Sequence, residues 1–417
     1  MRKSSLGALV AAGLLAGGLS AGSASAADLG GNCCADLEER IAELEATTAR
    51  KGNRKVSLTV SGWVAQQVVG WDDGFESNVY VGDIGATLSS HFKFTGQATI
   101  SPGWYAGYVI HVEARNENSL GITQAGPGLN ALGLLQSFWF IKSDHLGKLS
   151  VGLQSQASDN TAILVDGSGS LVPANWVAFD YNSFFLRSST GALSAVASWG
   201  GIGGCHGGGA IGDCNGLTQN VIRYDSPTFG GFSVSSSWGE DDMWDVAARY
   251  AGEWNGIKVA AAAAYNELSD EAFGVPLGDT FKYFQVGAYI EHVPTGLFLY
   301  GAYGNAEYDV RAGESETYYV KTGLRERWTP LGHTVLYGEY ENNQSTGSSA
   351  TGAFVQSAFG AVTTASDFDL WGVGIVQEID AAAMSVWVSY RHLEYDDSTA
   401  VNYEDFQYIK AGALINF

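Results

Sequence analysis

The sequence predicts a closed antiparallel β-barrel that crosses a membrane, preceded by one short helix. Three observations carry this prediction: apolar residues alternate with period two over most of the chain, connections alternate between short and long, and the alternation continues to the final residue. An α/β enzyme of this length would instead show extended segments with a period of 3.6 residues. We therefore expect an all-β, transmembrane fold.

Residues 1–27 have the features of a signal peptide. Arg2 and Lys3 form a charged start, residues 6–19 are an apolar run, and small residues follow up to Ala27. The run is too short to span a bilayer as a helix, and nothing after Ala27 offers roughly eighteen uninterrupted apolar residues. We expect the mature chain to cross the inner membrane and to carry no helical anchor.

The charge balance excludes several classes of partner. The chain has 22 Lys and Arg against 44 Asp and Glu, a net charge of -22. Nucleic acids and anionic surfaces need a basic footprint, so no nucleic-acid partner is expected. The 55 glycines, 12 tryptophans, 20 tyrosines and 19 phenylalanines suit short strands joined by turns, with aromatic girdles at both membrane interfaces.

Residues 28–55 form a segment ahead of the barrel, and 36–50 are the one convincing helix. Asp36 can cap it, and acidic residues occupy the faces away from its apolar stripe. Two interpretations stay open: a short trimeric stalk, or an amphipathic helix docked loosely elsewhere. The basic residues after it suit either a solvated linker or a contact with peptidoglycan. The stripe consists of Leu37, Ile41, Leu44 and Thr48.

From residue 56 to 417 the pattern has period two, which is the spacing of side chains that share one face of a strand. In residues 92–100, for example, Phe, Phe, Gly, Ala and Ile alternate with Lys, Thr, Gln and Thr. Most segments match the roughly ten residues of a tilted membrane-crossing strand. The eighteen candidate strands lie near 56–69, 92–100, 106–112, 134–142, 148–155, 181–187, 193–199, 219–225, 231–238, 246–251, 257–265, 281–291, 297–308, 317–327, 334–341, 368–378, 384–392 and 403–417.

The connections between these candidates separate into two classes. Short turns at one end of a barrel and long loops at the other are typical of outer-membrane proteins, whereas a soluble sandwich has no reason to segregate them. Short connections include 101–103, 145–147, 227–230, 254–256, 294–296 and 330–332, and the long ones are 116–133, 156–180, 200–218, 267–280 and 342–366.

The last strand has one wholly apolar face. An exposed strand edge of this kind would be adhesive in water, so an edge strand of a soluble sandwich is the weaker alternative to a strand that faces lipid. Pairing with the first strand, 56–69, is what would close the cylinder. The apolar face, which we assign to barrel closure, consists of Ile409, Ala411, Ala413, Ile415 and Phe417.

At this point the chain resembles a known family. The signal peptide, the stretch CCADLEERIAELEATTARKGNRKVSLTVSGWV (33–64) and the stretch SHFKFTGQATISPGWYAGYVIHVEA (90–114) are similar to those of alphaproteobacterial porins. The resemblance implies a barrel of 16 strands, a homotrimer, and one long loop folded into the lumen. It also implies passive diffusion of small hydrophilic solutes and ions. Because the family number rests on more than one sequence, we prefer 16 strands to our count of eighteen.

The resemblance also implies a location and partners. The protein is expected in the bacterial outer membrane, with both termini in the periplasm. Lipid, lipopolysaccharide and the barrel-assembly machinery are then its expected contacts. No cofactor or metal is expected.

Basic residues fall on the face opposite to the apolar one, which would line the pore. Similar porins narrow the channel with the loop after the fifth strand, here 156–180. Acids on this loop and cations on the wall would set a transverse field, which disfavours apolar solutes; scattered solvated charges that affect conductance only are the alternative. The loop acids are Asp159, Asp166 and Asp180, and the wall cations are Arg115, Arg187, Arg223, Arg249, Lys321, Arg325, Arg391 and Lys410.

Four cysteines lie outside the strands. Cys205 and Cys214 share one long loop, and an oxidising compartment favours a local disulfide between them. His206 lies between them, but two thiols and one imidazole make a weak metal site. Cys33 and Cys34 are vicinal, which disfavours pairing with each other; they either bridge neighbouring stalks or stay free.

Rival functions have less support. A lipase or protease built on a barrel needs an activated nucleophile beside a base, and the seven histidines show no such motif with Ser and an acid. An energy-coupled receptor needs an N-terminal plug domain, for which the segment before residue 56 is too short. A substrate-specific channel stays open. We expect the channel to prefer cations, because acidic loops at its mouth concentrate them.

Overall fold

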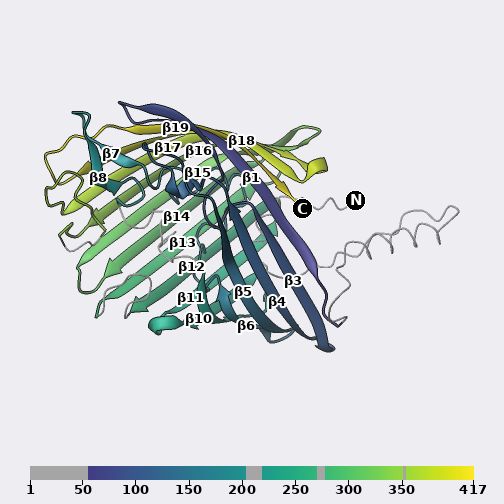
Figure 1. Cartoon of the computed structure of the whole chain (residues 1–417). Helices are drawn as coiled ribbons and strands as arrows, with labels where there is room; N and C mark the ends of the chain where they lie inside the picture. The colour runs from purple at the N-terminus through teal and green to yellow at the C-terminus, as the bar shows by residue number, and fades with distance from the viewer. Residues whose placement is uncertain (1–54, 203–217, 270–277, 351–353) are drawn as a thin grey trace.

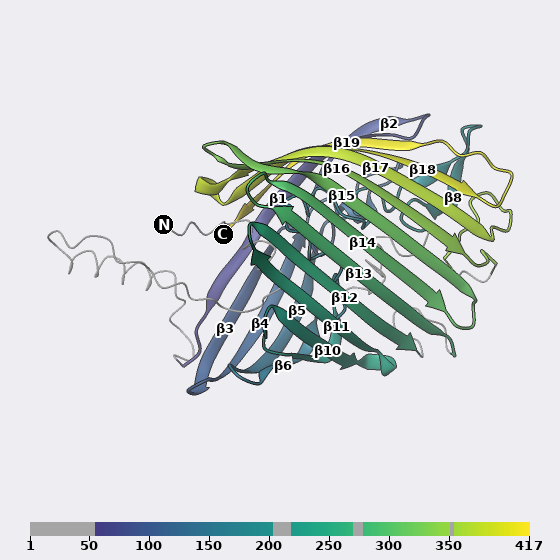
Figure 2. The ribbon, with the colours of Figure 1, turned by 180° about the vertical axis from the view of Figure 1, so that it is seen from behind.

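The computed structural model describes residues 55–202, 218–269, 278–350 and 354–417, and these form one closed β-barrel (Figures 1 and 2). The predicted signal peptide 1–27, the helix 36–50, Cys33 and Cys34, and the proposed Cys205–Cys214 disulfide lie outside the described residues. None of the described helices is long and apolar enough to span a membrane.

The wall is a single antiparallel sheet of 17 strands. Most of its strands are 11 residues or longer, enough for a tilted crossing of the bilayer. The wall strands are β1 (Thr59–Asp72), β2 (Ser77–Gly82), β3 (His91–Ser101), β4 (Trp104–Arg115), β5 (Ala131–Ser143), β6 (Gly147–Gln154), β9 (Gln219–Asp225), β10 (Phe232–Gly239), β11 (Trp244–Trp254), β12 (Ile257–Ser269), β13 (Thr280–His292), β14 (Leu297–Tyr308), β15 (Gly313–Thr329), β16 (Gly332–Thr346), β17 (Ala365–Ile379), β18 (Met384–Asp397) and β19 (Phe406–Asn416). Short 3₁₀ turns include η1 (Ser119–Gly121), η3 (Glu240–Asp242) and η5 (Asp380–Ala382).

The 17 strands fill 16 positions in the wall. Strands β2 and β3 both pair with β1, β2 with its second half and β3 with its first, so they share one position on either side of residues 83–90. The count of 16 is therefore confirmed. Our count of eighteen was wrong because the candidates near 181–187 and 193–199 contribute β7 (Phe185–Arg187) and β8 (Leu193–Ser198), a separate hairpin outside the wall sheet.

The barrel closes where the first and last strands pair. Val64 lies opposite Ile415, and Gly70 lies opposite Ile409, in an antiparallel ladder that runs from Trp63 to Asp72. In lipid every backbone amide and carbonyl must find a partner within the protein, so this ladder removes the last open edge. The residues that we assigned to closure lie along β19 and just after it, and Ile409, Ile415 and Phe417 are exposed on the outside.

The alternation along each wall strand separates lipid from lumen. Apolar side chains such as Val320, Val373 and Val388 are exposed on the outside, while the polar or charged neighbours of the same strands point inward and are buried. Charges on the outer face would be costly at the level of the hydrocarbon, which accounts for their inward phase. Trp104, Trp254 and Trp328 are exposed near the strand ends at one rim, as an interfacial aromatic girdle requires.

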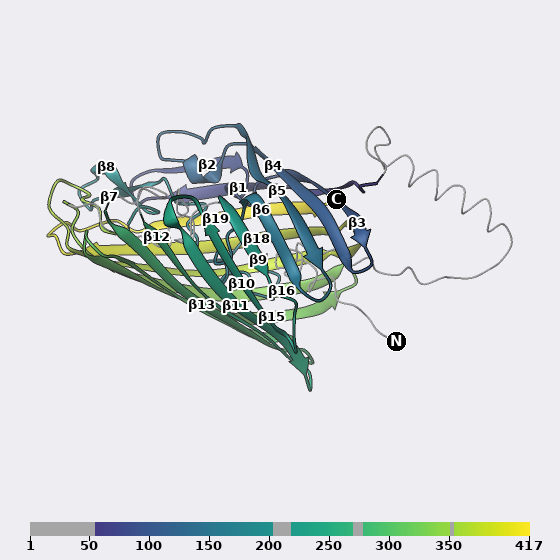
Figure 3. The ribbon, with the colours of Figure 1, turned by 90° about the horizontal axis from the view of Figure 1, so that it is seen from below.

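Connection lengths differ between the two ends, as predicted. We call the end that carries the C-terminus the short-turn end, and the opposite end, where β7 and β8 lie, the long-loop end (Figures 1 and 3). The longest connections, 116–130, 155–218 and 347–364, all join strand ends at the long-loop end, although the turn 309–312 there is short. The connections at the short-turn end are 102–103, 144–146, 226–231, 255–256, 293–296, 330–331 and 380–383.

The β7–β8 hairpin packs inside the long-loop end. Its flanking residues Phe184 and Trp199 contact Phe406, with ring centroids 4.8 and 5.9 Å apart. The inner faces of β17, β18 and β19 are apolar at this level, with Phe368 and Leu393 in the same buried cluster. The hairpin thus covers the part of the inner wall that would otherwise expose apolar side chains to water.

The lipid-facing assignment of the last strand can be tested by charge substitution. Ile409→Lys places a charge on the outer face and is expected to destabilise the folded barrel by about 2–4 kcal/mol. The measurement is the urea midpoint of folding into phospholipid vesicles. Gln407→Lys is the control, because Gln407 is exposed on the same face but lies closer to the long-loop rim. Equal effects of the two substitutions would contradict the assignment.

Candidate pore constriction

Residues 156–180 lie inside the barrel and are held against the inner wall. At the start of this loop, the Ala157 amide donates to the Ser237 hydroxyl at 2.9 Å. The amide and hydroxyl of Ser158 both donate to one oxygen of Asp245 at 2.7 Å. Asp245 is fully buried, so its carboxylate serves as a fixed acceptor on β11. The loop is therefore fastened to β10 and β11 as soon as it enters the lumen.

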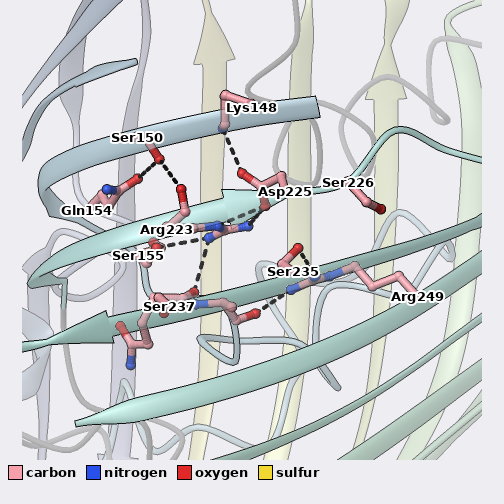
Figure 4. Close-up of polar contacts among 12 residues, drawn as sticks. Lys148, Ser150, Gln154, Ser155, Arg223, Asp225, Ser226, Ser235, Ser237 and Arg249 are labelled. Atoms are coloured by element: carbon pink, nitrogen blue, oxygen red, sulfur yellow. Dashed lines mark hydrogen bonds and ion pairs between the residues drawn. The ribbon is translucent and has the colours of Figure 1, made fainter. Parts of the chain in front are cut away.

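Two arginines hold the same part of the loop by its carbonyl oxygens (Figure 4). Arg223 on β9 donates to the carbonyls of Ser155 and Gln156 at 2.9 and 3.1 Å. Arg249 on β11 donates to the Ala157 carbonyl at 2.5 Å and to the Ser235 hydroxyl at 3.0 Å. Backbone carbonyls at a turn have no ladder partner, and a guanidinium with five donors satisfies several of them at once.

Asp225 neutralises part of this basic cluster. It accepts from Arg223 at 2.7 Å and lies 3.0 Å from the Lys148 ammonium on the neighbouring strand β6 (Figure 4). One carboxylate therefore serves two cations. Arg249 has no carboxylate within ion-pair distance among the residues that the structure describes.

The middle of the loop lies against β13 and β14. The Gln285 side chain donates to the Ser158 carbonyl at 3.0 Å and accepts from the Ala162 amide at 2.7 Å. The Tyr300 hydroxyl donates to the Ala162 carbonyl at 2.8 Å. A Cβ atom at Gly287 would lie 2.2 Å from that same carbonyl, so only glycine admits the loop backbone so close to the wall.

Lys321 on β15 joins two distant points of the loop. Its ammonium lies 2.5 Å from a carboxylate oxygen of Asp166 and donates to the Ala174 carbonyl at 2.7 Å. Both charged side chains are fully buried. Removing either partner would leave the other as an isolated buried charge, which costs about 3–5 kcal/mol.

The end of the loop is held by β18. Arg391 forms a two-pronged ion pair with Glu339 of β16, with both contacts at 2.8 Å. The Tyr319 hydroxyl donates to the same carboxylate at 2.5 Å. Fixed in this way, the guanidinium donates to the Asn175 carbonyl at 2.7 Å. Glu339 therefore positions the arginine, and the arginine positions the loop.

Asp180 fastens the last residue of the loop to the closure strands. Its carboxylate accepts from Lys410 on β19 and from Gln67 on β1, and all three side chains are buried. The pairing of β1 with β19 and the anchoring of the loop thus meet at one carboxylate.

One glycine sits directly on an ion pair of the wall. Arg325 of β15 and Glu378 of β17 are joined by contacts of 2.9 Å, and Gly169 of the loop lies on top of them. Its φ is +84°, a left-handed conformation, and an added Cβ would lie 2.8 Å from Glu378. Glycine is required here on both grounds.

These contacts contradict part of the prediction that loop acids and wall cations set a transverse field across the lumen. Asp166 and Asp180 do not face the water of the lumen, because each is buried beneath the loop in an ion pair with a wall lysine. Most of the predicted wall cations are occupied in the same way, by loop carbonyls or by carboxylates. Of the three loop acids, only Asp159 is partly exposed. The buried wall charges hold the loop.

Arg187 is a second correction. It was predicted to lie on the pore wall, but it belongs to β7, which is outside the wall sheet. Its guanidinium is buried and lies 2.8 Å from Asp73, in the connection between β1 and β2, and 3.1 Å from Glu76. Arg187 therefore secures the hairpin at the long-loop end. Arg115 is inward-facing at the end of β4, where it pairs with Glu113 at 3.2 Å.

An open space of about 1250 Å³ lies beside the loop, toward the short-turn end. The loop contributes Leu164, Leu171 and Val172 to its lining. The facing wall comes from the inner sides of β3 to β6 and β9, and the turns at the short-turn end complete it. The loop thus occupies one side of the lumen and leaves the other side open.

Several anchoring residues were missed at the level of sequence. Gln67, Asp245, Gln285 and Glu339 are uncharged or acidic, whereas only basic residues were considered for the wall. The sequence does show that these residues alternate with apolar residues along their strands, which places them on the lumen-facing side. Parity identifies such residues as lumen-facing but does not reveal which part of the loop each one contacts.

Anchoring by Lys321 can be tested without reference to function. Lys321→Met leaves Asp166 buried without its partner, so loop 156–180 should detach and become a cleavage site for chymotrypsin in the folded barrel. Adding Asp166→Asn should largely restore resistance, because the uncompensated charge is gone. Lys282→Met is the control, since Lys282 pairs with Asp309 outside the lumen. Unchanged cleavage in Lys321→Met would contradict the anchoring role.

Comparisons with known proteins agree with this architecture. Solved structures similar to the chain include OmpT of Vibrio cholerae in a trimer form (14% identity, TM-score 0.53, covering 87% of this chain and 99% of that one). OprB of Pseudomonas putida is another (11% identity, TM-score 0.54, 92% and 97% covered). The outer membrane channel DcaP of Acinetobacter baumannii is a third (8% identity, TM-score 0.51, 88% and 99% covered).

At these identities the solved structures establish the fold alone, and no curated protein matches the chain. The family model is more specific. A model of Gram-negative porins matches residues 8–414, nearly the whole sequence. The chain belongs to the Gram-negative porin family.

Proposed function

We propose that the protein forms a water-filled channel for passive diffusion of small hydrophilic solutes and ions across the outer membrane. The observation that carries the proposal is the placement of loop 156–180. The loop is fixed against β9 to β19 by many polar contacts, while the lumen beside β3 to β6 stays open. A barrel whose loop narrows but does not fill the lumen suits diffusion.

The wall on the open side of the lumen carries polar and charged side chains. Its wall includes Gln136, Gln154 and Ser155 together with charged residues, so hydrated solutes find hydrogen-bond partners along it. None of the described anchoring contacts requires a solute to form. Passage therefore needs no large rearrangement of the loop, which supports passive diffusion over an energy-coupled mechanism.

The proposal includes an orientation and an assembly. The short-turn end, with the C-terminus, faces the periplasm, and the long-loop end faces outward, where lipopolysaccharide surrounds it. Three copies form the working unit, in keeping with the trimer form of the similar Vibrio cholerae OmpT. The N-terminal stretches 33–64 and 90–114 support a place among the alphaproteobacterial members of the family.

Conductance of the purified protein in planar lipid bilayers tests this proposal. Large, ohmic, long-lived current steps that occur in groups of three are expected. Protein that has been heat-unfolded before addition is the control and should give none. Absence of conductance from folded protein would refute the channel, and steps that occur only singly would refute the trimer.

A further inference from the structure

The open side of the lumen carries a group of lysines that the loop does not use. Lys93 on β3, Lys142 on β5 and Lys148 on β6 all line the cavity beside loop 156–180. None of them donates to the loop in the described residues. They lie on β3, β5 and β6, where none of the described anchoring contacts is made, and we call them the lysine wall.

Two lysines of the lysine wall lie opposite each other on adjacent strands, and their repulsion destabilises the folded barrel. Lys142 and Lys148 are directly opposite each other on adjacent strands. Side chains in this relation share a face with Cβ atoms about 4.5–5.5 Å apart, and like charges there are destabilising. Lys148 is partly compensated by Asp225 at 3.0 Å. Lys142 has no such partner among the described residues, so no ion pair seen there offsets the repulsion that its charge adds.

Lys93 and Lys142 differ from the anchoring cations. Lys321, Arg391 and Lys410 each have a carboxylate partner and are buried. Among the described residues, Lys93 and Lys142 have no carboxylate within ion-pair distance and no hydrogen-bond partner, and both are partly exposed. Their ammonium groups are therefore available to a solute in the lumen.

The acidic residues that line the same cavity do not cancel these charges. Asp225 is shared between Lys148 and Arg223. Asp166, whose carboxylate is fully buried, and Glu378 and Asp380 are each paired with a different cation, namely Lys321, Arg325 and Arg327. Three carboxylates of the lining are left without an ion pair among the described residues: Asp144, exposed in the turn between β5 and β6, Asp159 of the loop, and the C-terminal carboxylate of Phe417. With Asp225 they make four, against five cations in the same lining, namely Lys93, Lys142, Lys148, Arg223 and Arg249, so the lining keeps a positive excess.

His111 adds a polar atom to the same wall. It lines the cavity next to Lys93 and is largely buried, and its Nε2 atom has no partner in the described residues. The neighbouring ring of His91 lies 4.2 Å away, centroid to centroid. Because this atom is itself buried, the imidazole does not reach a solute in the lumen, and the solute-facing charges are those of the lysines.

From this arrangement we infer that the lysine wall is a binding strip for small anionic solutes, such as phosphates and carboxylates, and that the channel prefers anions to cations. The inference rests on the proposed channel function and deepens it. It reverses the expectation from the net charge of -22, because the loop acids Asp166 and Asp180 are neutralised beneath the loop while Lys93 and Lys142 are not paired with a carboxylate of the described residues. Unpaired charges nearest the path of a solute dominate its energy there, since distant charges are screened beyond about 10 Å.

The test is the reversal potential of single channels in a potassium chloride gradient. The native channel should show the sign of an anion-selective pore. Lys93→Gln and Lys142→Gln should each lower the chloride-to-potassium permeability ratio by about threefold, as expected for loss of one charge several ångströms from the path in water. Lys282→Gln removes an equal charge outside the lumen and should leave the ratio unchanged.

A second measurement probes binding. Inorganic phosphate added to the bath should reduce the chloride current of the native channel in a saturable manner, and the Lys93→Gln/Lys142→Gln variant should lose most of this block. A native channel that conducts but prefers potassium would overturn the inference while leaving the channel function intact. Block by phosphate that persists in the double variant would equally overturn the assigned strip. Absence of any conductance would instead refute the proposed function.

Discussion

The structure depends on buried ion pairs that hold loop 156–180 against the inner wall of a closed barrel. Closure satisfies the backbone in lipid, but it leaves the lumen-facing wall free to carry charge. Lys321 and Lys410 use that freedom to fasten loop 156–180 through its carboxylates Asp166 and Asp180. Lys321 and Arg391 also hold loop carbonyls, and Arg391 is itself paired with Glu339 of the wall. Charges that would be costly if single are stable here because each is paired where water is excluded. The position of the loop, and hence the shape of the open lumen, follows from these contacts.

This arrangement divides the lumen into two sides with different roles. On the side of β9 to β19, polar side chains of the wall form hydrogen bonds and ion pairs with the loop. On the side of β3 to β6, Lys93 and Lys142 keep their charges available to the lumen. A channel of this kind derives its stability and its solute preference from different cations, so substitutions on one side need not disturb the other. Net charge is then a poor guide to ion preference, because it does not distinguish paired from unpaired groups.

Much of the fold could be predicted from the sequence, because lipid imposes a period of two on every wall strand. Alternation located all 16 wall positions and the closure of β1 with β19. It failed at Phe185–Arg187 and Leu193–Ser198, where a hairpin packed on an apolar inner wall shows the same local pattern as a spanning strand. The inward phase of Lys321 and Lys410 was also predictable. Their partners were not, since parity does not specify which residue of a long loop reaches which strand.

Cysteine accessibility across the loop tests the central claim most directly. In a variant whose native cysteines are replaced by serine, Leu164→Cys faces the cavity and Val165→Cys faces the wall, where Val165 is 4% exposed. A water-soluble methanethiosulfonate reagent added to single channels should modify position 164 and reduce the current, and it should leave position 165 unmodified. Equal reactivity at the two positions, or modification at 164 without any change in current, would contradict a loop held against the wall beside an open lumen.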